Sequence, residues 1–223
     1  MTGSLDILEG AAGLGHAMSD GPDWVKAVAT LGQTFHITRI TFKNHACCGH
    51  TFAPIDGALA LQAQFSIDPA AIDQVRISTY KAALEVAGYD TPATPAEARF
   101  SVKYTVATAL IHGSVRLAAF EPDRLADAAT RALMKKITLS VDAELDAAFP
   151  GQRAARISIQ LRDGRVLTHL QPTRKGDPEA PLSDDELEQK YLELAGPVLG
   201  QAAAGVLLAK LKTLDTVPSL ARL

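Results

Sequence analysis

The sequence predicts an α+β fold in which helices cover one face of a small mixed or antiparallel sheet. Several short runs alternate apolar and polar residues, which is typical of half-buried strands, and longer stretches repeat apolar residues at helical spacing. Asp163-Gly164 separates two of the alternating runs and indicates a β-hairpin. Only one strand–helix–strand unit is apparent, so a purely parallel sheet is not expected.

Length and composition set the class of protein. A chain of 223 residues is expected to form one large domain or about one and a half domains, since domains average about 150 residues. A net charge of −3 offers little attraction for nucleic acid, and no apolar run reaches the roughly 18 residues of a membrane span. The N-terminus lacks signal-peptide features and the adjacent Cys47 and Cys48 would form a strained disulfide, so a cytoplasmic location is expected.

The beginning of the chain carries weak patterns. Asp20-Gly21-Pro22-Asp23 predicts the start of a short helix that continues through Leu31. Residues 38–43 alternate, with Ile40 and Phe42 on one face, and therefore predict a strand. A turn is expected to follow this strand.

Stronger signals mark the later elements. Thr94-Pro95-Ala96-Glu97 is a capping box and Gly113 a typical helix terminator, so a helix is predicted over residues 94–113. Asp163-Gly164 predicts a type I′ turn, and Pro197 is expected to separate the last two helices. The other expected helices cover residues 51–65, 122–134, 183–196 and 198–211, with a short link at 142–149, and the expected strands cover residues 75–80, 137–141, 157–161 and 166–170.

The densest group of chemically active residues is the segment KNHACCGHT at residues 43–51. One interpretation is a zinc site, because its histidines and cysteines are typical zinc ligands. Against it, ligands from six consecutive residues can hardly surround one ion, and no second cluster exists in the sequence, so no metal is expected. The four residues concerned are His45, Cys47, Cys48 and His50.

A second interpretation is a nucleophilic cysteine. Cys47 and Cys48 precede a predicted helix, whose N-terminus would lower the pKa of a nearby thiol. Against this interpretation, a buried cysteine is commonly only a small hydrophobic residue.

A third interpretation is a site that binds carboxylates and transfers protons. Lys43 supplies a positive charge, Gly49 lets a ligand approach the backbone, and Thr51 begins a helix whose free N–H groups attract anions. His45 or His50 can move protons near neutral pH. Equally open is a strand-to-helix turn whose polar residues only satisfy one another.

Two further cations, Arg174 and Lys175, lie in a polar loop after the hairpin. Such a loop is typical of solvent-exposed chain. The two residues are nevertheless candidates for substrate binding, because each can pair with a carboxylate.

Ordered segments of the chain resemble the MmgE/PrpD family. Residues 43–58 (KNHACCGHTFAPIDGA) are similar to its signature segment, in which a lysine and a cysteine-containing turn precede T-H-x-x-I-D-A. Leu5–Gly10 is similar to the segment that leads into this region. The other similar segments are residues 95–104 (PAEARFSVKY), 161–165 (LRDGR) and 176–186 (GDPEAPLSDDE).

The resemblance implies a cofactor-free enzyme of small di- and tricarboxylates. The family includes 2-methylcitrate dehydratase, cis-aconitate decarboxylase and iminodisuccinate epimerase, which transfer protons next to a carboxylate and are usually homodimers. The function expected first is 2-methylcitrate dehydratase-like, in propionate metabolism. The alternative is a non-catalytic carboxylate-binding or assembly module.

Matched positions carry expected roles. Lys43 matches a family active-site lysine that binds or polarises a substrate carboxylate, and Cys48 falls where some members, decarboxylases among them, have an active-site histidine. Phe52 replaces the histidine of the family's T-H pair, which argues against a decarboxylase-like assignment. With His45 and His50, these residues give the expected catalytic set Lys43, His45, Cys48 and His50.

The resemblance covers the family's lid and its returning C-terminal helices, whereas its N-terminal helical domain has no counterpart here. The expected parts are a helical segment at residues 1–35, the lid at 36–180 and C-terminal helices at 181–223. The chain is therefore expected to be a fragment, or a half-protein that pairs with a separate helical half, and to be inactive alone. The apolar faces of its last two helices are expected to be exposed or buried in a dimer.

Overall fold

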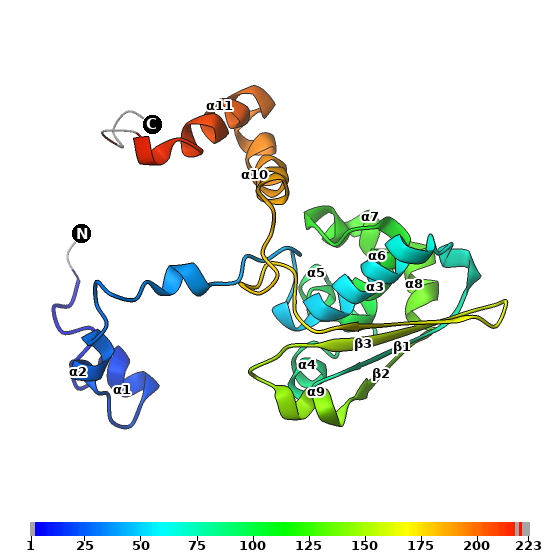
Figure 1. Ribbon diagram of the computed structural model, residues 1–223, viewed down its shortest axis with the longest axis horizontal. Helices are drawn as coiled ribbons and strands as arrows, with labels where there is room; N and C mark the ends of the chain where they lie inside the picture. The colour runs from blue at the N-terminus through cyan, green and yellow to red at the C-terminus, as the bar shows by residue number, and fades with distance from the viewer. Residues whose placement is uncertain (1–2, 217–218, 220–223) are drawn as a thin grey trace. The chain divides into compact units, whose positions relative to one another are not determined.

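The computed structural model describes residues 3–216 and 219 and divides the chain into two compact units (Figure 1). The first unit is Met1–Ile40 and the second is Thr41–Leu223. The sheet and the segment at residues 43–51 both belong to the second unit.

The first unit holds short helices with mostly exposed side chains. The carboxylate of Asp23 accepts a hydrogen bond from the backbone N–H of Lys26 at 2.9 Å and caps the second helix. The predicted helix start is thus confirmed, but the helix ends at Val28 and not at Leu31. The helical elements of this unit are α1 (Leu14–Met18), α2 (Trp24–Val28) and a 3₁₀ helix at His36–Arg39.

The strand predicted over residues 38–43 is wrong. The side chains of Ile40 and Phe42 are 46% and 49% exposed, so their alternation does not bury one face against a sheet. The backbone N–H of Phe42 donates to the carbonyl oxygen of Gly176 at 2.8 Å, in a loop rather than in a strand. A strand needs a repeated ladder of such bonds, and within the described residues no neighbouring strand offers one here.

The α+β prediction is confirmed by a four-stranded mixed sheet with the strand order β2-β1-β3-β4. β1 and β2 are parallel, whereas β1–β3 and β3–β4 are antiparallel. Ile77 of β1 lies between Leu139 and Ile157 of its two neighbours. The strands are β1 (Ile72–Thr79), β2 (Ile137–Val141), β3 (Ala155–Leu161) and β4 (Val166–Gln171).

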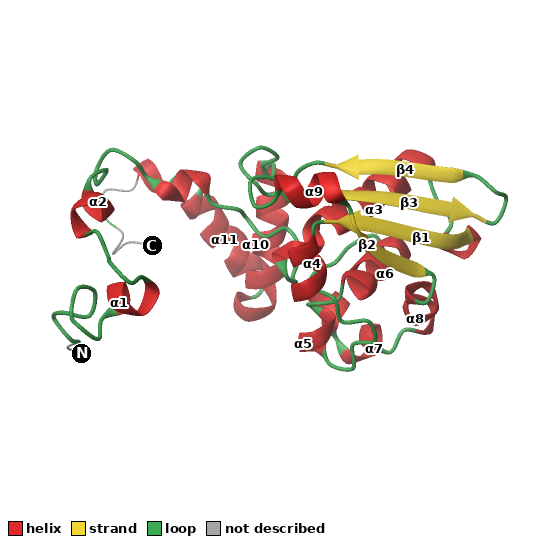
Figure 2. Cartoon of the chain, turned by 90° about the horizontal axis from the view of Figure 1, so that it is seen from below, coloured by secondary structure: helices red, strands yellow, loops and turns green. Residues whose placement is uncertain are grey.

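Helices cover one face of this sheet, and Figure 2 shows the strands in front of α3 and α6. The other face is mostly polar, with Ser78 and Ser140 joined by a hydrogen bond of 2.8 Å across β1 and β2. Gly57 lets α3 lie close to β3, because a Cβ at this position would be 2.2 Å from Cδ1 of Ile157. The helices between residues 52 and 148 are α3 (Phe52–Phe65), α4 (Lys81–Val86), α5 (Pro95–Ala98), α6 (Val102–His112), α7 (Pro122–Leu125), α8 (Ala128–Met134) and α9 (Ala143–Ala148).

Two helices predicted as continuous are each divided in the structure. The helix at residues 94–113 is α5 and α6, because the hydroxyl of Ser101 caps a new helix by accepting the N–H of Tyr104 at 3.1 Å. The helix at residues 122–134 is α7 and α8, because Asp127 caps α8 in the same way. The predicted terminator Gly113 is confirmed, with a φ of +74°.

The β3–β4 hairpin is confirmed, but its predicted turn type is wrong. A type I′ turn needs positive φ at two central residues, whereas here only Gly164 of the pair has it, at +89°. The N–H of Gly164 bonds to the carbonyl of Leu161 at 3.0 Å. This is a turn followed by one left-handed glycine, the pattern of a three-residue hairpin loop.

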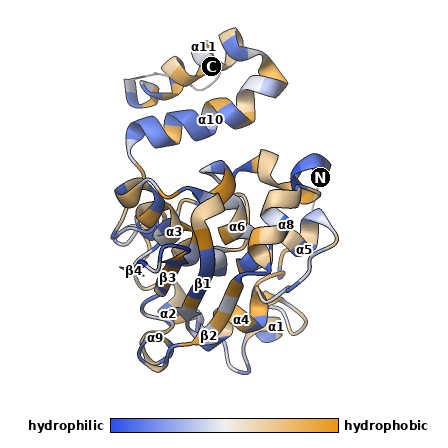
Figure 3. Cartoon of the chain, turned by 90° about the vertical axis from the view of Figure 1, so that its right-hand side faces the viewer, coloured by the Kyte–Doolittle hydropathy of each residue, from blue (hydrophilic) through white to orange (hydrophobic). Residues whose placement is uncertain are grey.

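The chain's second unit ends in α10 (Asp184–Leu199) and α11 (Gln201–Leu211). Ser183 and Glu186 form the predicted capping box at the start of α10, which is mostly hydrophilic (Figure 3). The prediction that Pro197 separates the last two helices is wrong, because Pro197 lies inside α10. The helix ends at Leu199, before Gly200, whose φ of +80° an L side chain rarely adopts. Among the described residues, no helix is long and apolar enough to cross a membrane.

Candidate functional site

The segment at residues 43–51 forms a loop that leads into α3 through a 3₁₀ turn at Gly49–Thr51. Backbone hydrogen bonds hold it on two sides: the N–H of Ala46 donates to Val115 at 3.0 Å, and that of Cys48 donates to Arg99 at 2.9 Å. We call this segment the site loop. Its side chains point in different directions, which divides the predicted site residues into separate groups.

The first group lines a pocket of about 350 Å³ beside α10, which we call the Cys48 pocket. Phe100, Leu117 and Leu194 give it an apolar wall. Its polar and ionisable lining residues are Lys43, Asn44, His45, Cys47, Cys48, Arg99, Arg116, Lys190 and Glu193.

The Cys48 pocket is strongly cationic. Arg116 is neutralised by Glu193, with 2.7 Å between Nε and Oε2. Lys43 and Arg99 have no carboxylate partner within the described part of the chain. Burial lowers the pKa of Lys190, and the nearby Arg116 lowers it further. An anion in this pocket would meet positive charge that the protein leaves unbalanced.

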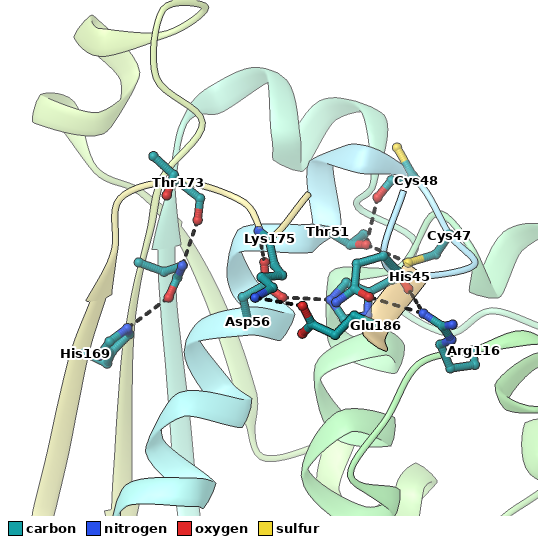
Figure 4. A network of polar contacts seen from close by, with 12 residues as sticks. His45, Cys47, Cys48, Thr51, Asp56, Arg116, His169, Thr173, Lys175 and Glu186 are labelled. Atoms are coloured by element: carbon teal, nitrogen blue, oxygen red, sulfur yellow. Dashed lines mark hydrogen bonds and ion pairs between the residues drawn. The ribbon is translucent and has the colours of Figure 1, made fainter. Parts of the chain in front are cut away.

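His45 is held by a buried carboxylate. Its Nε2 lies 2.8 Å from Oδ1 of Asp56, and both side chains are less than a tenth exposed. The second oxygen of Asp56 accepts the backbone N–H of Lys175 at 2.8 Å. Figure 4 shows that one carboxylate therefore joins α3 to both the site loop and the loop after β4.

The two cysteines have different environments. The thiol of Cys47 is buried against the Thr51 hydroxyl at 3.0 Å, and burial raises its pKa to about 12, which contradicts an activated nucleophile at this residue. Cys48 is half-buried and lines the Cys48 pocket, and its sulfur points away from Cys47 and Thr51 in Figure 4.

The four residues of the zinc interpretation do not form a cluster of metal ligands in the structure. His45 bonds to Asp56, and Cys47 bonds to Thr51. His50 turns to a third partner, the hydroxyl of Tyr80. Over residues 3–216 and 219, no three His, Cys, Asp or Glu side chains are grouped so that they could hold a metal ion.

The second group of predicted residues lines a separate pocket of about 290 Å³, which we call the Arg153 pocket. Lys43 lines this pocket as well as the first. The other residues lining it are Thr41, Gly49, His50, Phe52, Arg153 and Arg174.

Arg174 is built into the wall of the Arg153 pocket. Its Nε and Nη2 donate to the two carboxylate oxygens of Asp177 at 2.9 and 2.6 Å. Burial acts to raise the pKa of Asp177, but hydrogen bonds from Arg174 and Thr41 outweigh it and hold this pKa below its ordinary value. Gly49 leaves room for the guanidinium, since a Cβ there would be 3.1 Å from Nη1.

Two predicted substrate-binding residues have other contacts. Thr51 is fully buried, and its hydroxyl donates to the carbonyl of Cys48 at 2.8 Å, so its side chain stabilises the loop from within. The ammonium group of Lys175 pairs with Glu186 at the start of α10, at 3.0 Å. Neither side chain is among those that line the two pockets.

Comparison with known proteins decides the family. Residues 45–215 match the MmgE/PrpD C-terminal domain. The chain belongs to the MmgE/PrpD family. The predicted resemblance to the C-terminal part of this family is therefore confirmed, and the match includes most residues of both pockets.

Several MmgE/PrpD relatives are named for one activity. The chain is 31% identical to the cis-aconitate decarboxylase-like protein oryM of Aspergillus oryzae over 78% of its own length and 37% of that protein. It is 26% identical to cis-aconitate decarboxylase of Aspergillus terreus, over 79% of this chain and 38% of that one. It is 29% identical to cis-aconitate decarboxylase of Mus musculus, over 59% of this chain and 28% of that one. The chain thus spans less than two-fifths of the length of these relatives.

Some residues of this MmgE/PrpD site were not predicted from the sequence. Asp56 stands in the I-D pair of the family signature, so its position in a motif was a usable signal. Arg153 and Tyr80 lie far from the site loop in sequence, and no local pattern marks them. Only the pairing of β1 with β3 brings their neighbourhoods together, because Thr79 pairs with Ala155.

Proposed function

We propose that this chain is the carboxylate-binding part of an MmgE/PrpD lyase or isomerase that acts on a small tricarboxylate of the cis-aconitate class. The observation that carries the proposal is the composition of the Cys48 pocket. The two positions that the resemblance assigns to the active site, Lys43 and Cys48, both line it. The additional cations Arg99 and Lys190 line it too, as expected for a substrate with several negative charges.

The chemistry proposed for this pocket is proton transfer next to a carboxylate. When a proton leaves that carbon, negative charge moves onto the carboxylate oxygens, and Lys43 and Arg99 stabilise it there. The same cations stabilise the carbanion left by loss of carbon dioxide, before a proton is added. Lys190, whose pKa is lowered by burial, and His45, fixed by Asp56, are the groups of this chain that hold or move the proton.

The names of the relatives favour cis-aconitate over 2-methylcitrate as the substrate to test first. The reaction proposed for this site is dehydration or decarboxylation: the names of the relatives favour decarboxylation, whereas Cys48 and Phe52, which replace histidines expected in decarboxylase-like members, favour dehydration. Assembly as a homodimer or with a helical half, a cytoplasmic location and a role in propionate metabolism remain predictions from the sequence.

Titration calorimetry with cis-aconitate tests the proposal on the chain itself. Arg99→Met removes the guanidinium cation, which lies 4.8 Å from the ring centroid of Phe120, and keeps an unbranched side chain; it is expected to weaken binding about tenfold. The matched control is Arg165→Met, because Arg165 lies in the hairpin loop and pairs only with its neighbour Asp163 among the described residues. The absence of binding by the unmodified chain, or equal losses in the two variants, would contradict the proposal.

A second candidate function is a subunit-assembly module, favoured by exposed apolar residues on α10 and α11. Val198 is 80% exposed and Val206 61% exposed, as predicted for helices that pack on another body. Mixing the chain with a helical half from an MmgE/PrpD protein separates the two candidates. Gain of activity supports the enzyme, whereas tight association without activity supports the module.

A further inference from the structure

We propose that the Arg153 pocket is a second anion-binding site, separate from the Cys48 pocket, that takes a small dianion with oxygen ligands such as a dicarboxylate or phosphate. The inference rests on a different pocket from the proposed function, although the two pockets share one cation. Lys43 is the single residue that lines both of them.

The charges that face the Arg153 pocket are unbalanced. Lys43 and Arg153 have no carboxylate partner anywhere in the part of the chain that is described. Arg174 is neutralised by Asp177 and adds hydrogen-bond donors without net charge. The two uncompensated cations match a ligand with two negative charges.

Arg174 is held in place before any ligand arrives. Asp177 fixes the guanidinium of Arg174 with two bonds, and Nη1 also donates to the carbonyl oxygen of Gly49 at 3.4 Å. The guanidinium of Arg153 lies 5.8 Å from the ring of Phe149. Fixed donors lose little conformational entropy on binding, so a small anion can be held by few contacts.

His50 gives the site a dependence on pH. Its Nδ1 lies 2.8 Å from the hydroxyl of Tyr80, so Nε2 is left for the pocket. Burial, followed by the charges of Arg153 and Arg174, lowers the pKa of His50 below its ordinary value. Since the other groups lining the pocket are Lys43 and neutral side chains, a bound anion would reverse part of this effect.

These charges set the direction in which anion binding and the protonation of His50 affect each other. Tyr80 itself stays neutral, because burial raises its pKa to about 12, and the carboxylate of Asp177 is occupied by Arg174. An anion in the pocket raises the pKa of His50, and protonation of His50 in turn tightens anion binding. Binding is therefore expected to be stronger at about pH 6 than at about pH 8.

Separate titrations with sodium succinate and inorganic phosphate test this site, with the His50 ring followed by NMR. Arg153→Met is expected to weaken binding about tenfold and to abolish the rise in the His50 pKa. Arg153→Lys, which restores the charge, is expected to recover most of the affinity. Arg165→Met serves as the control for general loss of positive charge.

The Arg99→Met variant separates this site from the proposed substrate pocket. It is expected to leave the succinate and phosphate titrations unchanged, whereas Arg153→Met leaves the cis-aconitate titration of the Cys48 pocket unchanged. Binding of succinate alone identifies a dicarboxylate site, and binding of phosphate alone a phosphate site. If neither anion shifts the His50 signals, or if both variants lose both titrations equally, the second site does not exist.

Discussion

At the scale of single residues, Asp56 connects the parts of the site. Its carboxylate is buried, and its two oxygens hold His45 of the site loop and the backbone of Lys175 after β4. A buried carboxylate with both partners satisfied fixes those partners firmly, but it becomes costly when either partner is lost. The sequence alone showed Asp56 only as part of a motif, because neither contact is local in the chain.

Replacing Asp56 by alanine is expected to lower the free energy of unfolding by about 2–4 kcal/mol, because it removes the hydrogen-bond partner of the buried ring nitrogen of His45 and of the N–H of Lys175. Urea unfolding measures the change. Asp73→Ala is the control, since Asp73 is exposed on β1, and its effect is expected to stay within about 0.5 kcal/mol. Equal effects of the two substitutions would show that Asp56 does not have this role.

The two cysteines are expected to differ in reactivity. At about pH 8 a thiol with a pKa of about 12 is almost wholly protonated, so Cys47 should resist iodoacetamide while the half-buried Cys48 reacts. Mass spectrometry of peptides from the native chain should find the adduct on Cys48, and unfolded chain should carry two. Comparable labelling of Cys47 in the native chain would contradict the buried position.

At the scale of elements, signals from neighbouring residues predicted helix starts correctly, whereas two helices predicted as continuous are each divided. The capping boxes at Thr94 and Ser183 correctly predicted two helix starts, because a capping box is made by residues close in sequence. The breaks before α6 and α8 were missed, since a single Ser101 or Asp127 begins a new helix within an unbroken apolar pattern. The strand at residues 38–43 was wrong because pairing depends on a distant neighbour.

The approach of α3 to the sheet gives a test at this scale. Gly57→Ala gains about 1 kcal/mol of helix propensity, but its Cβ would overlap Cδ1 of Ile157, and overpacking costs about 1–3 kcal/mol. A net destabilisation of about 1 kcal/mol is therefore expected in urea unfolding.

Removal of the overlapping methyl group provides the control for this packing. Ile157→Val deletes Cδ1, so the double variant with Gly57→Ala should be less destabilised than the sum of the two single variants. Additive effects would mean that the close approach of α3 to β3 does not limit residue 57.

At the scale of the whole molecule, the chain spans less than two-fifths of its MmgE/PrpD relatives, and its site carries binding groups from one part only. The purified chain is therefore expected to bind cis-aconitate but to show no turnover of cis-aconitate or 2-methylcitrate in an assay of product formation. Full turnover by this chain alone would overturn the division of roles proposed here.

Two features of the site could not have been predicted from the sequence at this scale. The residues around the site loop were predicted as one group, but the fold directs Cys48 and His50 into different pockets. Arg153 lines the Arg153 pocket only because β1 and β3 pair and bring its neighbourhood close to the site loop. Motif residues can therefore be listed from the sequence, whereas their grouping depends on the sheet.

The most direct test of the central claim is an NMR titration of the chain with cis-aconitate that maps the amide shifts. The largest changes are expected at residues 43–48 of the site loop, at Arg99 and Phe100, and at Lys190 of α10, all of which line the Cys48 pocket. The residues around the hairpin loop at Arg165 should not respond. Shifts confined to other surfaces, or none at saturating ligand, would contradict the claim that this chain carries the carboxylate-binding site.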